Sequence, residues 1–368
     1  MTELAGHLVL FDRVLPGRIT FDATIHEVAG CARVPDRYVL PGFVDVHVHG
    51  GGGGDVIDGR TGVETLARFH LGHGTTTLLP TTITRPWPEV MDMLRAVQAV
   101  RGQGNADGPS IPGAHLEGPF LSPGRLGAQP PFAILPDPAL LEQVLSLDVV
   151  RVVTLAPEIE GAEAAIHAFA RAGVRISLGH TNAGFACAEQ ALVWIAAAGG
   201  VAGATHLFNA MDGIAGRAPG VIGAILRSRT AHAELILDTH HVHPASFAIA
   251  RDMLGDRLLL ITDAMRATGL GDGPSELGGQ AVTIRDDIAR LPNGSLAGSV
   301  LTLDQALRHA LDAGTPLPQA ARLVAANACA YLGLGDRGRL EPGLRADFAV
   351  LDFAMQVVEV WVGGRRLV

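Results

Sequence analysis

The chain has 368 residues, 48% of them hydrophobic, and carries a formal net charge of −9 at pH 7. This acidic balance, without a basic run or interleaved basic and aromatic residues, argues against a nucleic-acid partner. A membrane-spanning segment is not expected either, because the longest apolar run, residues 191–204, is interrupted by Gly199-Gly200 and is too short to cross a bilayer.

The two ends of the chain share one pattern. Residues 1–40 read as short strands separated by turn residues, and the C-terminal segment, residues 336–368, is also strand-like with a Gly-Gly turn. Neither end could bury its apolar face alone. We therefore expect residues 1–40 and 336–368 to pack together as one small β-sandwich domain.

Between the ends, strand-like and helix-like segments alternate, which predicts a parallel sheet with crossover helices. Helical patterns fall, for example, at residues 61–70, 88–100, 161–172, 183–198 and 244–254. Strands are predicted at residues 43–47, 75–80, 111–116, 150–156, 174–178, 201–205, 234–238 and 258–262. Eight such units match a closed barrel better than an open sheet. The predicted fold class is therefore α/β, a (β/α)8 TIM-like barrel over residues 41–335 with a small β-sandwich domain from both termini.

After the eighth predicted strand the pattern changes. Residues 277–299 show short alternating runs around a Pro292-Asn293-Gly294 turn, which indicates an inserted hairpin.

Imidazole or carboxylate side chains stand where five of the predicted strands end. In a (β/α)8 barrel the carboxyl ends of the strands converge on one face, where such enzymes keep their active sites. A shared metal centre is therefore predicted from His47, His49, Glu117, His180, His206 and Asp263.

The spacing of these residues suggests individual roles. His47 and His49 are two apart in an extended segment, so both imidazoles face the same side. Glu117, His180 and His206 form a His2Glu set with one exchangeable position, a familiar arrangement for catalytic zinc. Asp263 is placed to take a proton from the attacking water and return it to a leaving amine. The alternative for Asp263 is a structural aspartate that caps the next segment.

The sequence contains no lysine, so all 28 basic residues are arginine. No carbamylated lysine can bridge two metals, and any bridging ligand must be a carboxylate, for which Glu117 is the candidate. An anion must be held by arginine, histidine or backbone N–H groups.

Cysteine usage bears on the compartment. The three cysteines, Cys31, Cys187 and Cys329, are far apart and in no CxxC spacing, which fits a reducing environment. The first residues show no signal-like apolar stretch. We expect a cytoplasmic protein.

These motifs occur in a familiar order. The chain resembles the N-acetylglucosamine-6-phosphate deacetylases of the amidohydrolase superfamily over almost its whole length, in the segments PGFVDVHVHG, HLEGPF, TLAPE, GHTNA, THLFNAM, GRAPG, HHVHP, ITDAM and EPGLRADFAVLD. The resemblance implies hydrolysis of the N-acetyl group of N-acetylglucosamine-6-phosphate to glucosamine-6-phosphate and acetate. It also implies a metal-bound hydroxide as nucleophile, with Asp263 as general acid and base.

The resemblance extends to the site residues. Glu117, His180 and His206 look like the metal site shared by the family, and His47 and His49 match members that hold a second metal. One or two divalent ions are therefore implied, with zinc as the first candidate and iron, cobalt or manganese as the others. The residues similar to the family's sugar-phosphate recognition surface are Asn209, Ala210, Arg217 and His241. Part of that surface comes from a neighbouring subunit in the family, which implies a homodimer.

One position departs from the family. After HLEGP the family usually has a Gly-Ala-His-Pro-like segment whose histidine helps to polarise the acyl carbonyl, whereas this chain has Gln129 at the corresponding position. A glutamine amide donates a hydrogen bond but cannot carry a positive charge, so oxyanion stabilisation from Gln129 should be weaker. Either the metals take over more of that work, or the preferred acyl group or sugar differs.

Two alternatives follow. The chain could be a deacetylase for N-acetylgalactosamine-6-phosphate or for a differently acylated sugar. It could also be a sugar-phosphate-binding homologue that has lost catalysis, with Gln129 as the sign, although the retained Asp263 and ligand residues argue against this. A cyclic-amide hydrolase or a deaminase would not account for the NAM and GRAPG segments.

Overall fold

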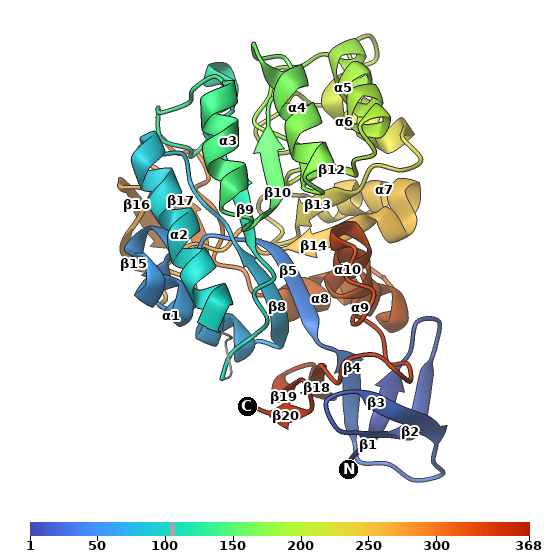
Figure 1. Ribbon diagram of the computed structural model, residues 1–368. Coiled ribbons are helices and arrows are strands. Elements are labelled where there is room, and N and C mark those ends of the chain that lie inside the picture. Colours follow the sequence, from blue (N-terminus) through green and yellow to red (C-terminus); the bar gives the residue numbers. More distant parts are fainter. Residues whose placement is uncertain (104–106) are drawn as a thin grey trace.

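A ring of eight parallel strands forms the centre of the computed structural model, which describes residues 1–103 and 107–368 (Figure 1). The strands of the ring are β5 (Phe43–Val48), β8 (Thr75–Pro80), β9 (Ala114–Glu117), β10 (Val150–Leu155), β11 (Arg175–Leu178), β12 (Ala202–Ala204), β13 (Ala233–Ile236) and β14 (Leu258–Ile261). All eight predicted strands are present. The third begins at Ala114 rather than at Ile111, because Pro112 and Gly113 interrupt the extended run.

Hydrogen bonds close the ring between its separate sheets. β5 pairs with β8, β9 to β12 form a four-stranded sheet, and β13 pairs with β14. The three gaps are bridged by Thr82 N to His115 O (3.0 Å), Leu207 N to Glu234 O (2.8 Å) and Asp263 N to His47 O (2.9 Å). The closed (β/α)8 barrel predicted from the alternation of elements is therefore confirmed.

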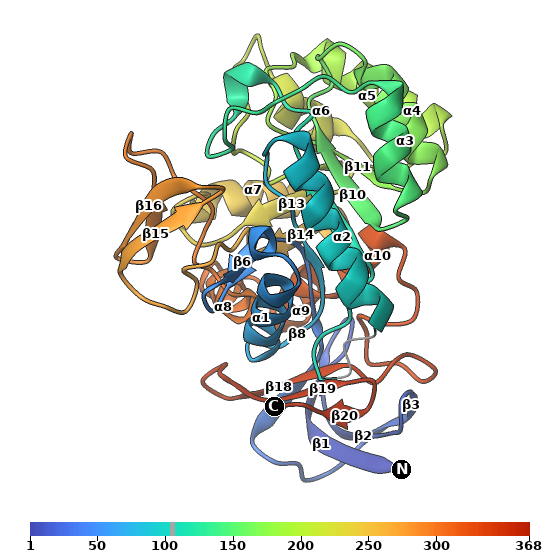
Figure 2. The ribbon, with the colours of Figure 1, turned by 60° about the vertical axis from the view of Figure 1, so that its left-hand side comes forward.

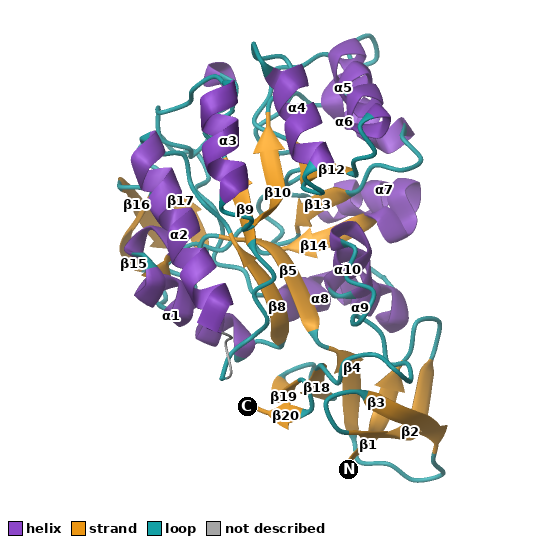
Figure 3. Cartoon of the chain, in the orientation of Figure 1, coloured by secondary structure: helices purple, strands orange, loops and turns teal. Residues whose placement is uncertain are grey.

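Helices cover the outside of the barrel (Figure 3). They are α1 (Arg60–Leu71), α2 (Trp87–Gln103), α3 (Pro138–Ser146), α4 (Ala162–Arg171), α5 (Phe185–Ala197), α6 (Gly220–Arg227), α7 (Pro244–Leu254), α8 (Leu303–Asp312), α9 (Leu317–Val324) and α10 (Ala326–Leu332). In α4 the buried side chains Ala162, Ala165, Ile166 and Phe169 recur at helical spacing and form its inner face. Covered on both faces, β5 and β8 are buried along their whole length.

Strands from both termini form a second domain beside the amino ends of β5 and β8 (Figure 1). These strands are β1 (Thr2–Val9), β2 (Val14–Phe21), β3 (Ile25–Gly30), β4 (Arg37–Pro41), β18 (Phe348–Asp352), β19 (Val357–Val362) and β20 (Arg365–Arg366). They are joined in one seven-stranded sheet in the order β20-β19-β18-β4-β1-β2-β3. The expected sandwich is therefore a single sheet that folds over on itself rather than two sheets with separate hydrogen bonding.

Ring contacts show this folding. Phe21 on β2 lies 5.0 Å from Phe348 on β18 and 5.2 Å from Trp361 on β19, measured between ring centroids. In a flat sheet these strands would be separated by three or four spacings of about 4.8 Å. The sheet therefore encloses its own small core. We propose that the two boundaries between the terminal domain and the barrel lie where they were predicted. The first, at residues 40/41, is next to the end of β4, and the second, at residues 335/336, is beyond α10.

The predicted insertion after β14 is a three-stranded antiparallel sheet that projects from one side of the barrel (Figure 2). It consists of β15 (Gly273–Leu277), β16 (Gln280–Arg285) and β17 (Ile288–Arg290), one strand more than the hairpin expected from the sequence. Two short strands, β6 (Gly50–Gly51) and β7 (Gly54–Asp55), lie in the glycine-rich loop after β5. Within the described residues, no helix is both long and apolar enough for a membrane span.

Candidate metal centre

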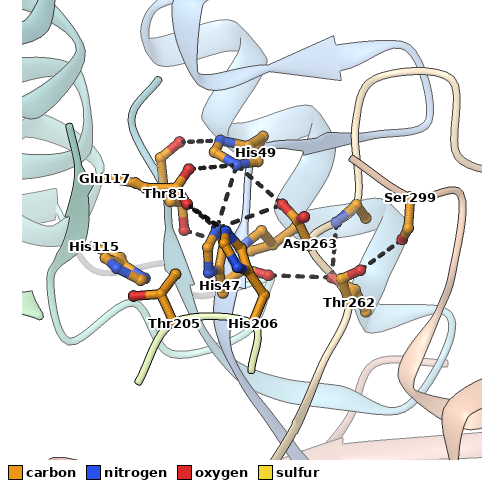
Figure 4. A network of polar contacts seen from close by, with 12 residues as sticks. His47, His49, Thr81, His115, Glu117, Thr205, His206, Thr262, Asp263 and Ser299 are labelled. Atoms are coloured by element: carbon orange, nitrogen blue, oxygen red, sulfur yellow. Dashed lines mark hydrogen bonds and ion pairs between the residues drawn. The ribbon is translucent and has the colours of Figure 1, made fainter. Parts of the chain in front are cut away.

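Side chains from five barrel strands gather at the carboxyl ends of the strands. Figure 4 shows His47, His49, Glu117, His206 and Asp263 pointing toward one another. On β5, Asp45 and His47 alternate with buried valines, and His49 follows two residues later. The alternation sends these three side chains into the barrel while the valines face the surrounding helices. Glu117 ends β9, and His180, His206 and Asp263 follow β11, β12 and β14.

The first group consists of Glu117, His180 and His206. Glu117 Oε1 lies 3.1 Å from His180 Nε2 and 3.2 Å from His206 Nε2. The two imidazole nitrogens are 3.0 Å apart. All three ligand atoms lie within 4.8 Å of one another, and all three residues are buried. The predicted His2Glu set is thus brought together in space.

The second group consists of His47, His49 and Asp263. Asp263 Oδ1 lies 3.1 Å from His49 Nε2 and 3.4 Å from His47 Nε2. Glu117 connects the two groups, because its Oε1 is 3.5 Å from His47 Nε2 and its Oε2 is 3.2 Å from His49 Nε2. One carboxylate therefore faces both groups.

The outer nitrogens of three imidazoles are held by acceptors. His47 Nδ1 lies 3.0 Å from Glu234 Oε2, His49 Nδ1 lies 3.1 Å from Thr81 O, and His180 Nδ1 lies 2.9 Å from Arg125 O. A carboxylate or carbonyl can only accept, so each Nδ1 carries a proton and Nε2 is the nitrogen that faces the centre, with its lone pair free for a metal whenever Nε2 is deprotonated. This is the tautomer that metal ligation requires.

Backbone strain is concentrated at the same residues. His180, His206 and Asp263 have φ values of 49°, 31° and 50°, in the left-handed region that side chains with a Cβ seldom adopt. Such strain costs about 1–3 kcal/mol per residue and persists where the surroundings fix it. The strain turns these side chains inward where the strands end.

The charges of the centre depend on one another. Burial by itself would lower the pKa of His47, but the Glu117 and Asp263 carboxylates hold it well above its usual value. The same balance raises the pKa of His49 to about 9. Burial opposes ionisation of Glu117 and Asp263, yet the neighbouring imidazoles keep both of their pKa values low. The two carboxylates are therefore charged at neutral pH and need positive partners, either imidazolium protons or a metal cation.

This donor set fits divalent metal ions. Imidazole nitrogens and carboxylate oxygens are the usual ligands of zinc and of related first-row ions. Four Nε2 atoms converge within a few ångströms, an arrangement that a shared cation stabilises and that neutral imidazoles alone would not favour.

A pocket of about 240 Å³ adjoins the centre and is lined in part by Glu117 and Asp263. Four of the predicted substrate residues also line it, namely Gln129, Asn209, Ala210 and His241. Arg217 does not. It lies exposed in the turn before α6, where its guanidinium forms no hydrogen bond or ion pair with the described residues. No described arginine is among the lining residues, so the pocket of one chain holds no guanidinium for an anion.

Sequence reasoning missed three acidic residues around the centre. Glu234 was read as part of a strand, although it is buried and bonds His47. Asp45 accepts hydrogen bonds from Thr262 Oγ1 (2.6 Å) and His47 N (3.2 Å), which links β5 to β14. Asp238 Oδ2 lies 2.6 Å from His241 Nδ1. A charged residue inside an otherwise apolar barrel strand was the available signal for Asp45 and Glu234.

Comparisons with known proteins place the chain among its relatives. A model of the family described as "Amidohydrolase family" matches residues 38–367. The chain is 37% identical to N-acetylgalactosamine-6-phosphate deacetylase from Escherichia coli O157:H7, over 89% of this chain and 87% of the relative. It is 36% identical to N-acetylglucosamine-6-phosphate deacetylase from Lysinibacillus sphaericus, over 89% of this chain and 85% of the relative.

Among solved structures, the chain is similar to a mutant of N-acetyl-D-glucosamine-6-phosphate deacetylase from Mycobacterium smegmatis in complex with N-acetyl-D-glucosamine-6-phosphate. The TM-score is 0.92 at 34% identity, covering 100% of this chain and 99% of the other.

Proposed function

Because the chain belongs to the amidohydrolase family, and within it to the N-acetylglucosamine-6-phosphate deacetylases, we propose that it is a metal-dependent deacetylase acting on N-acetylglucosamine-6-phosphate. The reaction is hydrolysis of the acetamide C–N bond, which yields glucosamine-6-phosphate and acetate. The observation that carries this proposal is the Glu117 carboxylate facing two groups of imidazoles beside a pocket that Asp263 also lines.

The chain's own donor groups would hold the metal. Glu117, His180 and His206 would hold one divalent ion, and His47, His49 and Asp263, with Glu117 shared, would hold a second. When bound, such an ion acts as a Lewis acid that polarises the acyl carbonyl and makes water acidic enough to attack near neutral pH. The His2Glu set supports zinc as the metal, with iron, cobalt or manganese as the other candidates.

Asp263 serves as the proton carrier. Its carboxylate lines the pocket, and its low pKa keeps it ionised at neutral pH despite burial. It therefore accepts a proton from the attacking water. The departing nitrogen then takes that proton, so that a neutral amine leaves rather than an amide anion.

The remaining pocket residues hold the sugar. His241 is oriented by Asp238, which accepts from Nδ1 and leaves Nε2 for the substrate. Asn209 and Ala210 supply polar groups at the pocket wall. Arg217 would hold the 6-phosphate, since its guanidinium matches a phosphate bidentately.

A homodimer would complete this surface, because no guanidinium lines the pocket of a single chain. The apolar side chains Ile214, Ile249 and Met253 are each more than half exposed, on the turn that carries Arg217 and on α7. These exposed apolar side chains support an interface between two copies. Light scattering should give twice the chain mass, and changing Ile249 and Met253 to glutamate should give monomers.

The free cysteines Cys31, Cys187 and Cys329 support a reducing compartment, and we propose the cytoplasm.

The similar identities to a galactosamine and a glucosamine deacetylase make the sugar epimer the sharpest question. Acetate release should be measured from N-acetylglucosamine and N-acetylgalactosamine, each with and without a 6-phosphate, and from N-propionyl analogues. The highest kcat/KM is expected for N-acetylglucosamine-6-phosphate. A preference for the galacto epimer would make the first alternative correct, and binding without acetate release by metal-replete protein would indicate a non-catalytic homologue.

A further inference from the structure

Gln129 is fixed at both ends of its side-chain amide. The backbone N–H of Thr84 donates to Gln129 Oε1 at 2.7 Å, and Gln129 Nε2 donates to Glu117 Oε2 at 2.5 Å. Because a backbone N–H can only donate, the oxygen must face Thr84 and the nitrogen must face Glu117. The orientation of the amide is thus determined by its partners, and Gln129 is only 7% exposed.

This hydrogen bond acts on the carboxylate that both ligand groups share. The last torsion of a glutamate side chain is soft, so Glu117 could rotate about it without a restraint. In the structure one oxygen faces His180 and His206 while the other faces His49, an arrangement that requires one particular carboxylate plane. Gln129 holds the second oxygen and so restrains that plane.

The segment that carries Gln129 is itself held by the inserted sheet. Gln280 Nε2 donates to Ala128 O at 2.7 Å, and Arg85 Nη1 donates to Gly278 O at 3.1 Å. Gly278 has φ +57°, and a Cβ there would lie 2.8 Å from Ile83 and 2.9 Å from Pro130. The turn between β15 and β16 therefore packs tightly on both sides of Gln129, which leaves its amide little freedom.

We propose that Gln129 is a positioning residue that orients Glu117 as the bridging ligand, in addition to its place in the substrate pocket. This inference rests on the proposed function, because it assigns a role within the same metal centre. A neutral amide suits the role, since it adds no positive charge beside four imidazoles and the cations they would bind. Nε2 carries two hydrogens, so one remains for the acyl oxygen of a substrate when the other bonds Glu117.

The test combines metal binding with kinetics. Gln129→Leu removes both hydrogen bonds and keeps a side chain of similar volume. Gln129→Asn keeps the amide group, but its side chain is one methylene shorter and cannot reach both Thr84 and Glu117. Gln356→Leu, at an exposed position in the terminal domain, serves as the control. Zn²⁺ affinity is measured by competition with a chelator, metal content by elemental analysis after dialysis, and kcat and KM with the best substrate of the panel.

Both Gln129 variants should bind Zn²⁺ about 10- to 100-fold more weakly than the wild type, the range for groups that orient metal ligands. Their kcat should fall further than their KM rises, and Gln356→Leu should match the wild type. Wild-type Zn²⁺ affinity in both variants, with a raised KM, would overturn the proposal and leave Gln129 as a substrate contact only. If Gln129→Leu does not fold, Gln129→Asn alone decides. If the wild type releases no acetate, the proposed function fails, but the Zn²⁺ measurement still judges the role of Gln129.

Discussion

Removal of the Glu234 carboxylate should weaken metal binding although Glu234 belongs to neither ligand group. Its Oε2 lies 3.0 Å from His47 Nδ1, and both side chains are almost fully buried. In Glu234→Ala the Nδ1–H would lose its acceptor in a site that water does not readily reach. A buried donor left without a partner costs about 1–3 kcal/mol. At about 1.4 kcal/mol per tenfold, this corresponds to roughly a 10- to 100-fold loss of affinity.

Glu234→Gln separates geometry from charge. A glutamine oxygen at the same place still accepts from Nδ1 and keeps the tautomer of His47, but it carries no negative charge to support the imidazole. The loss of Zn²⁺ affinity in Glu234→Gln should therefore be smaller than in Glu234→Ala, about tenfold or less.

The assay is competition for Zn²⁺ with a chromophoric chelator, and circular dichroism of the metal-free proteins checks that each variant is folded. Glu163→Ala is the matched control, because Glu163 also lies near a histidine, His167, but on the exposed surface of α4. It should bind Zn²⁺ like the wild type. If folded Glu234→Ala binds Zn²⁺ as tightly as the wild type does, the reasoning that Glu234 supports His47 is refuted.

Three further predictions concern the proton carrier, the phosphate and stability. Asp263→Asn should reduce kcat by about 10²- to 10⁴-fold while the protein stays folded; near-normal turnover would contradict its role as acid and base. Arg217→Ala should raise KM for the phosphorylated substrate by roughly 10- to 100-fold and leave the unphosphorylated sugar unaffected, as measured by acetate release from both. Burial opposes ionisation of Asp304, but His73, Thr302 and Arg308 lower its pKa to about 2, below the ordinary 3.8. A depressed pKa stabilises the fold above pH 3.8 and stops doing so as the pH falls through 2. Asp304→Asn should therefore cost about 2 kcal/mol more in unfolding free energy at pH 7 than near pH 2, whereas the exposed Asp92→Asn should show no such difference in denaturant titrations.

Local patterns in the sequence were sufficient for the barrel. The alternation of apolar strand-like segments with segments of helical periodicity predicted all eight barrel strands. This was possible because the spacing of apolar residues that marks a strand or a helix involves only residues close together in the sequence. The two-residue spacing of His47 and His49 placed both imidazoles on one side for the same reason. The absence of lysine left a carboxylate as the only candidate for a bridging ligand, and Glu117 faces both groups of candidate ligands.

The contacts among these elements could not be read from the sequence. The bond of Glu234 to His47 joins residues 187 positions apart, and the apolar residues around Glu234 mark it as unusual without showing which side chain it meets. The hydrogen bond of Gln129 to Glu117 and the exclusion of Arg217 from the pocket depend on how loops pack over the barrel face. Closure of the ring fixes the register of β5 against β14 and so brings His47 to Asp263. Local periodicity sets which way each side chain points, and only the closed barrel determines what each side chain meets.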